Sequence, residues 1–164
     1  MKNSIFKKIC AVSLSALMFV GTGAAEAGSF IGASLPVYAA GVTPASDFEY
    51  VTNDTGTITI TGFKGTQTDV VIPKTIAGKA VTKIGRDAFY GCTGLTSITI
   101  PKSVTKIDVD AFYGCTGLTS IKIPDSVTEI GGYTFSGCTG LTSIKIPDSV
   151  TTIDDGALDR KSVV

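Results

Sequence analysis

The sequence predicts a β-rich solenoid, in which short repeats stack so that their strands form a parallel sheet. Three observations point to this fold. A segment of 23 residues recurs three times in register, and each copy contains an alternating strand pattern that ends at a proline. No single copy carries enough apolar residues to bury a core alone, so the copies are expected to stack with their strands roughly 4.8 Å apart.

The three copies span residues 81–103, 104–126 and 127–149, and a partial fourth copy follows at 150–158. The first and second copies agree at 19 of 23 positions, and the second and third agree at 17 of 23. Because agreement in register at this level does not arise by chance, the repeat is expected to define the fold of residues 81–158.

Each copy supplies one strand and one tight connection. In the first copy, Ile98 and Ile100 point to one side of the strand and Thr99 points to the other. Pro101 ends the strand because it has no N–H group to donate. The connection, at 110–114 in the second copy, is expected to form short helical turns before a glycine breaks them. Stacking then aligns equivalent side chains into an aromatic and an aliphatic column, formed by Phe89, Phe112 and Phe135 and by Leu95, Leu118 and Leu141.

The segment 47–80 does not repeat and is expected to be an N-terminal cap. Residues 48–52 and 57–63 alternate apolar and polar side chains around an Asn-Asp-Thr-Gly turn, which predicts a β-hairpin. Residues 70–73 match only the end of the repeat strand, which indicates an imperfect first rung. Gly78 lies in the longer connection that follows, where a small excursion is expected. The hairpin and imperfect rung would cover the open edge of the first copy.

The first 39 residues are interpreted as a signal peptide. Lys2, Lys7 and Lys8 form a basic start, and residues 9–20 form an apolar run that is too short to span a bilayer comfortably. Small-residue cleavage sites end at Ala27 and Ala39, and the second is favoured because the recognisable folded sequence begins only near residue 47. An uncleaved membrane anchor is the alternative, and no other membrane contact is expected.

The last six residues, 159–164, depart from the repeat. Their sequence, DRKSVV, is also the translation of a common sequencing-library adaptor, so we interpret them as a non-native tail on a truncated chain whose natural sequence continues with further repeats. A genuine short tail is the alternative, and the codons at this place distinguish the two.

The composition argues against several classes of function. The chain has 14 basic and 14 acidic residues, so it lacks the charge excess of a nucleic-acid-binding protein. It contains no histidine, which removes imidazole-based catalytic dyads and imidazole metal ligands. We therefore expect no enzyme, no catalytic residue, no cofactor and no metal.

Two sets of side chains could still carry chemistry. Cys92, Cys115 and Cys138 recur once per repeat and are interpreted as buried thiols, because a straight column does not converge on a metal ion. A disulfide between two of them remains open. The carboxylate pairs at 108/110 and 154/155 are interpreted as solvated surface residues, since nothing indicates the cleft that a glycosidase needs.

The period, the L-x-x-I-x-I-P-x-x-V-x-x-I pattern and the A-F-x-x-C motif together resemble the BspA-like, or Treponema pallidum-type, leucine-rich repeat of bacterial surface proteins. The resemblance covers residues 69–158. It implies a leucine-rich repeat solenoid that is secreted or held at the cell surface and that binds extracellular or host proteins in adhesion. A structural spacer that presents another domain is the alternative, and part of a surface enzyme with a catalytic domain elsewhere is a third possibility.

The outward-facing strand positions are the candidate protein-binding face. On a solenoid these positions line one continuous surface. The surface is small and polar and almost lacks the Tyr, Trp and Arg residues that dominate binding hot spots, so a solvated face without a ligand is the competing interpretation. The candidate residues are Thr96, Ser97, Thr99, Thr119, Ser120, Lys122, Thr142, Ser143 and Lys145.

Overall fold

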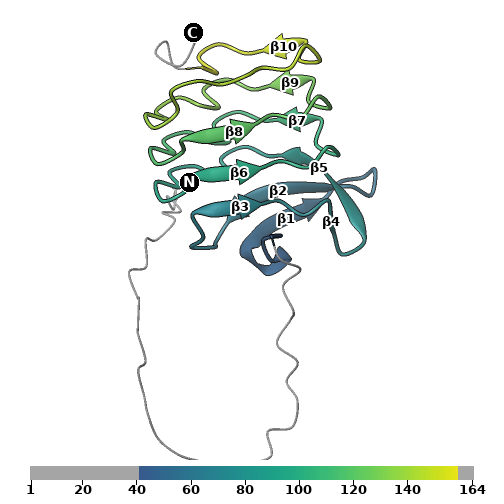
Figure 1. Cartoon of the computed structure of the whole chain (residues 1–164). Coiled ribbons are helices and arrows are strands. Elements are labelled where there is room, and N and C mark those ends of the chain that lie inside the picture. Colours follow the sequence, from purple (N-terminus) through teal and green to yellow (C-terminus); the bar gives the residue numbers. More distant parts are fainter. Residues whose placement is uncertain (1–40, 159–164) are drawn as a thin grey trace, which may run out of the picture.

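A computed structural model describes residues 41–158, which form a solenoid of stacked turns (Figure 1). Each turn, or rung, carries a strand in one sheet, a tight connection and a strand in a second sheet. The larger sheet, sheet A, contains β1 (Phe48–Thr52), β2 (Ile58–Phe63), β5 (Lys79–Ile84), β7 (Lys106–Ile107), β9 (Glu129–Ile130) and β10 (Thr152–Ile153) in that spatial order, with β4 (Thr75–Ile76) beside β5. The smaller sheet, sheet B, contains β3 (Asp69–Val71), β6 (Ser97–Thr99) and β8 (Ser120–Lys122).

The stacking of the 23-residue repeats in parallel register is confirmed. In sheet B, β6 pairs with β8 so that Ile98 lies beside Ile121, its equivalent in the next copy. In sheet A, β5 pairs with β7 so that Ile84 lies beside Ile107. We number the rungs 1 to 4 after the copies that begin at residues 81, 104, 127 and 150.

Sheet A was not expected from the repeat sequence. Its strands β7, β9 and β10 are only two residues long, so they show no alternation of apolar and polar side chains over a useful length. These strands form because each rung places the same short extended segment beside the equivalent segment of the neighbouring rung. The backbone groups of the two segments can then form hydrogen bonds.

The connections between the two sheets are tight turns, and the helical turns expected there are not formed. Asp87, Asp110 and Tyr133 have positive φ angles of 58°, 57° and 55°, which a right-handed helix does not allow. The amides alternate between two kinds of partner. Tyr90 N donates to Asp87 O in its own rung at 3.1 Å, whereas Phe89 N donates to the carbonyl of the equivalent connection in the next rung at 2.8 Å. The second kind of bond explains why turns, rather than helices, are stable in a stack.

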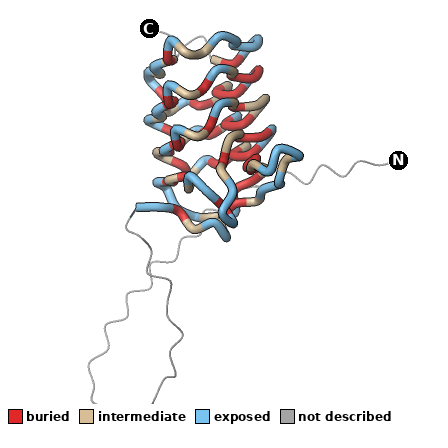
Figure 2. The backbone as a smooth tube through the Cα atoms, turned by 90° about the vertical axis from the view of Figure 1, so that its right-hand side faces the viewer, coloured by how far each residue is buried: buried red, intermediate tan, exposed pale blue. Residues whose placement is uncertain are grey.

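The core follows the predicted columns. Phe89 and Phe112 stack with ring centroids 5.1 Å apart, and Phe112 and Phe135 stack at 5.6 Å. The column extends into the cap, where Phe63 lies 5.5 Å from Phe89 and Phe48 packs against both. Figure 2 shows the buried positions recurring at the same place in successive rungs.

The predicted hairpin is present and consists of β1 and β2, which pair in antiparallel fashion. Its second strand also pairs in parallel with β5, so that Ile58 lies beside Val81 and Ile60 beside Ile84. The hairpin is therefore joined directly to the sheet A ladder. The excursion expected near Gly78 is the small antiparallel pair of β4 and β5. A short 3₁₀ helix, η1 (Ala45–Asp47), precedes β1.

Between residues 41 and 158, no helix is long and apolar enough to cross a membrane. The expected signal peptide at 1–39 and the expected non-native tail at 159–164 lie outside the described residues.

Candidate binding face

The nine candidate residues all lie on the sheet B side of the rungs, and none of them is buried. Pairing of β6 with β8 places Ser97 beside Ser120 and Thr99 beside Lys122. The third-rung residues Thr142, Ser143 and Lys145 continue these columns in the repeat, but the structure assigns no strand to them. The predicted face is therefore a continuous sheet surface over two rungs, and strand pairing is lost at the third rung.

Some of the candidate hydroxyls are used to hold the rungs together. Thr96 Oγ1 donates to Thr68 O at 3.0 Å, and Thr119 Oγ1 donates to Thr96 O at 3.1 Å. Ser97 Oγ donates to Asp69 Oδ1 at 2.5 Å, and this hydrogen bond is the main reason that the pKa of Asp69 lies below its ordinary value. The hydroxyl groups of these residues therefore already form hydrogen bonds within the fold.

The two candidate lysines differ, because Lys122 and Lys145 form no ion pair with any residue from 41 to 158. Three cations on the sheet A side are instead paired with acids of the next rung. These ion pairs are Lys83–Asp108 at 2.6 Å, Lys106–Glu129 at 2.5 Å and Arg86–Asp110 at 3.8 Å.

The sheet A ion pairs also shift the pKa values of their members. Burial would raise the pKa of Asp108, but hydrogen bonds from Lys83 and from the Val109 amide hold it below its ordinary value. The hydrogen bond to Glu129 raises the pKa of Lys106. These ion pairs compensate the charges of Lys83, Arg86 and Lys106 on the sheet A side, whereas Lys122 and Lys145 leave positive charge exposed on the sheet B side.

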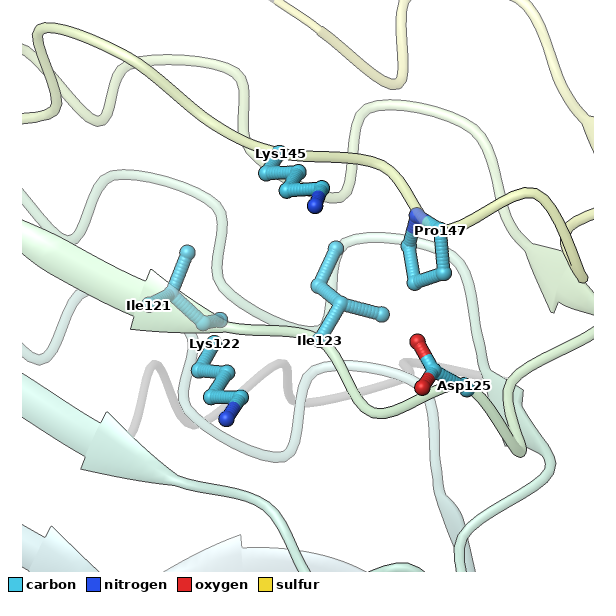
Figure 3. A pocket seen from close by; sticks show the side chains of 6 residues that line it. All are labelled: Ile121, Lys122, Ile123, Asp125, Lys145 and Pro147. Carbon is cyan, nitrogen blue, oxygen red and sulfur yellow. The ribbon is translucent and has the colours of Figure 1, made fainter.

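A groove of about 300 Å³ lies between β8 and the third-rung segment (Figure 3). Its lining includes both unpaired lysines, three apolar side chains and one carboxylate. In Figure 3, the Lys145 side chain reaches from the third rung toward the groove, which Ile123 and Pro147 border from opposite rungs. The lining residues are Ile121, Lys122, Ile123, Asp125, Lys145 and Pro147.

Sequence reasoning missed this groove. It identified Lys122 and Lys145 as surface residues but expected residues 142–147 of rung 3 to form a regular strand. The available signal was the recurrence of lysine at the position that Thr99 occupies in rung 1. Tyr133 was also missed: it is 52% exposed and borders a shallow hollow of about 470 Å³ with Asp154 and Asp155. It stands where rungs 1 and 2 carry aspartate, so the repeat gave no reason to expect an aromatic residue.

The expectation of buried thiols is met at two of the three cysteines of the column, since Cys92 is disulfide-bonded. Cys115 and Cys138 are buried thiols, and their Sγ atoms donate to Phe89 O and Phe112 O, each at 3.1 Å. The hydrogen bond with Cys138 and burial raise the pKa of Cys115, so its reactive thiolate is disfavoured. No group of three potential metal-ligating side chains occurs in the part of the chain that the structure describes.

Comparison with known proteins places this geometry in a family. Residues 57–163, which are most of the chain, match the BspA type leucine rich repeat region in six copies. The chain belongs to this family. The match with the BspA-type repeat begins within the hairpin turn, just before β2, in agreement with the pairing of that strand with β5.

Solved structures of bacterial leucine-rich repeat proteins are similar to this BspA-type chain. A T. pallidum leucine-rich repeat protein is 38% identical, with a TM-score of 0.65 over 66% of this chain and 51% of its own. A leucine-rich cell surface protein of Faecalibacterium prausnitzii is 36% identical, with a TM-score of 0.62 over 69% of this chain and 32% of its own. A Bacteroides capillosus leucine-rich repeat protein is 27% identical, with a TM-score of 0.63 over 74% of this chain and 97% of its own.

The chain spans about half the length of the T. pallidum protein and about a third of the F. prausnitzii protein. A search of curated proteins finds no match. Leucine-rich repeat proteins of this kind are non-enzymatic repeat proteins and are commonly used for protein binding. The description of the F. prausnitzii relative as a cell surface protein suggests a surface or extracellular location for BspA-type repeats.

Proposed function

We propose that this BspA-type chain is a protein-binding module that acts in adhesion outside the cell, and that it binds extracellular or host proteins through the outer face of sheet B. The common use of the repeat in protein binding and the surface location of a relative support this proposal. The observation that carries it is the contrast between the repeat lysines of the two sheets: Lys83 and Lys106 of sheet A each form an ion pair, whereas Lys122 and Lys145 on the sheet B side form none among residues 41–158.

Unpaired lysines on a regular sheet favour a partner with an acidic surface. Such charges increase the rate of encounter and set the orientation of the bound partner, and their effect falls as salt increases. The hydroxyl groups of Thr99 and Ser120 lie on the same face and can donate or accept hydrogen bonds to a polar partner. Large aromatic anchors are lacking on this face, which favours binding through many modest contacts across several rungs.

The proposal is tested by measuring binding of the full chain to a panel of purified extracellular-matrix proteins by biolayer interferometry. We expect saturable binding to at least one acidic matrix protein. The double variant Lys122→Glu/Lys145→Glu should weaken that binding by at least about tenfold, because each replacement converts an attractive contact into a repulsive one.

The matched control is the double variant Lys64→Glu/Lys74→Glu, which changes the net charge equally at exposed positions outside sheet B. It should bind as the unchanged protein does. Equal weakening in both double variants would show a general charge effect and reject the face. Absence of binding across the panel would reject adhesion and favour the alternative, a solenoid spacer that presents another domain.

A further inference from the structure

Sheet B loses its ladder at the third rung. β6 and β8 pair over three residues, and Thr119 N donates to Thr96 O at 3.0 Å. One rung later, the amides of 142–148 donate no backbone hydrogen bond to any described residue. The outer edge of β8 therefore presents unpaired N–H and C=O groups.

The opening is local, because rung 3 remains attached to rung 2 elsewhere. Gly140 N donates to Thr116 O at 3.1 Å, and Phe135 stacks on Phe112. In sheet A, β9 pairs with β7 on one side and with β10 on the other. The loss of pairing is therefore confined to the sheet B side of rung 3.

Like charges meet where the ladder stops. Lys122 and Lys145 occupy the same position of consecutive copies, and a regular ladder would place them directly opposite each other. Like charges directly opposite destabilise strand pairing. One rung earlier, Lys122 lies beside the neutral Thr99, and that pairing is intact.

The same chain shows what keeps such a lysine pair together. In sheet A, Lys83 and Lys106 are direct neighbours in the ladder of β5 and β7, yet those strands pair. There, Asp108 lies 2.6 Å from Lys83 and Glu129 lies 2.5 Å from Lys106. Sheet B lacks the equivalent carboxylates, since neither Lys122 nor Lys145 takes part in an ion pair within residues 41–158.

We infer that the groove between β8 and residues 142–147 is a β-augmentation site for an extended peptide segment that alternates acidic and apolar side chains. The peptide backbone pairs with the free edge of β8, as an added strand does in other sheets. Its carboxylates bind Lys122 and Lys145 in the way that Asp108 and Glu129 bind the sheet A lysines.

The groove suits such a segment in lining and in size. Ile121, Ile123 and Pro147 offer an apolar surface to every second side chain, in keeping with the two-residue period of a strand. Its volume of about 300 Å³ is that of a short segment rather than of a folded domain. Asp125 also lines the groove and disfavours a second acidic group at that end.

This inference rests on the proposed function, because it assigns a partner segment to the same sheet. It is tested by fluorescence anisotropy with two labelled hexapeptides, one alternating glutamate with valine and the other alternating lysine with valine. The full chain should bind the acidic peptide at least about tenfold more tightly than the basic one. Added salt should weaken that binding.

Two variants close the groove by different chemistry. Lys145→Thr restores the pairing that Thr99 makes with Lys122, and Lys145→Glu places a carboxylate opposite Lys122. Both should lose peptide binding by at least about tenfold. In both, the amides of 143–145 should gain protection from hydrogen exchange as the third-rung strand joins β8. Lys64→Glu, the control, should change neither measurement.

Equal binding of the two peptides, or unchanged binding in both Lys145 variants, would overturn the inference. Loss of peptide binding in these variants without added amide protection would also overturn it, because charge alone would then account for the loss. If the chain binds a matrix protein but neither peptide, the groove is rejected and the proposed function stands. If it binds the acidic peptide but no matrix protein, the groove stands and adhesion to matrix is rejected.

Discussion

At the scale of single residues, the repeat reuses the same contact in every rung, and the exceptions mark where the stack changes. Ser126 Oγ donates to Val104 O at 2.7 Å, and Ser149 Oγ donates to Val127 O at 2.9 Å. Ser103, the equivalent residue of rung 1, is half-buried, and its Oγ atom is buried without a hydrogen-bond partner. Its acceptor would be the carbonyl of Val81, which lies in β5, where pairing with β2 and β4 replaces the usual path of the repeat.

Replacing each serine by alanine should therefore have opposite effects on the free energy of unfolding. Ser126→Ala should lower it by about 1 kcal/mol, because the hydrogen bond is lost. Ser103→Ala should leave it unchanged or raise it by up to about 1 kcal/mol, because a buried, unsatisfied hydroxyl is removed. Urea unfolding of the two variants measures the difference. A similar loss in both would show that Ser103 has a partner in solution.

At the scale of elements, the parallel pairings of sheet A are only two or three residues long, and ion pairs between rungs support them. Lys83 and Asp108 connect rung 1 to rung 2, and Lys106 and Glu129 connect rung 2 to rung 3. Together these ion pairs neutralise Lys83 and Lys106, the two lysines that the ladder places side by side. Where no carboxylate does this, at Lys122 and Lys145, the strands do not pair.

The contribution of Asp108 should depend on pH in a defined direction. Its pKa in the folded chain is held below the ordinary value, so its stabilising effect is full above about pH 4, the pKa of an aspartate in an unfolded chain. That effect is lost as pH falls through the lower, folded pKa. Asp108→Asn should flatten the fall in stability below about pH 4, as followed by circular dichroism during acid titration. Asp148→Asn, at an exposed carboxylate, should leave the profile as it is; an unchanged profile for Asp108→Asn would contradict this account.

At the scale of the whole molecule, each rung contacts mainly its neighbours, and stability is shared between rungs through their interfaces. The hairpin covers one end of this array. Ile58 of β2 is fully buried beside Val81, and Phe63 continues the aromatic column into the cap. Covering the first rung in this way removes the open strand edge and the open apolar layer together.

Placing a charge at the junction should therefore unfold the cap before the far rungs. Ile58→Asp should lower the free energy of unfolding by about 3 kcal/mol or more, because an unpaired carboxylate replaces a buried apolar side chain. Hydrogen exchange should show loss of protection in β2 and β5 first, with β7 and β9 less affected. Val51→Asp, at a residue that is 50% exposed, is the control and should have little effect. Uniform loss of protection would instead show that cap and rungs unfold as one unit.

Much of this architecture could be predicted because repetition is itself a structural constraint. Three nearly identical copies must follow nearly identical paths, so the parallel register, the phenylalanine column and the outward position of Thr99 and Lys122 follow from the sequence. The hairpin at β1 and β2 follows from local alternation around a turn. The short strands β7, β9 and β10 of sheet A and the turns that replaced the expected helices could not be predicted, because hydrogen bonds between rungs stabilise them.

The sequence by itself determined the content of a rung, the stacking of rungs and the set of side chains that face outward, since these depend on residues that recur at a fixed spacing. Only the tertiary structure decided which of those side chains are free. Stacking brings Asp108 to Lys83 and Glu129 to Lys106, but it brings no carboxylate to Lys122 or Lys145. Electrostatic interactions depend on distance in space and not on separation in the sequence. Residues 23 or 25 positions apart in the chain can therefore determine whether two strands form hydrogen bonds with each other.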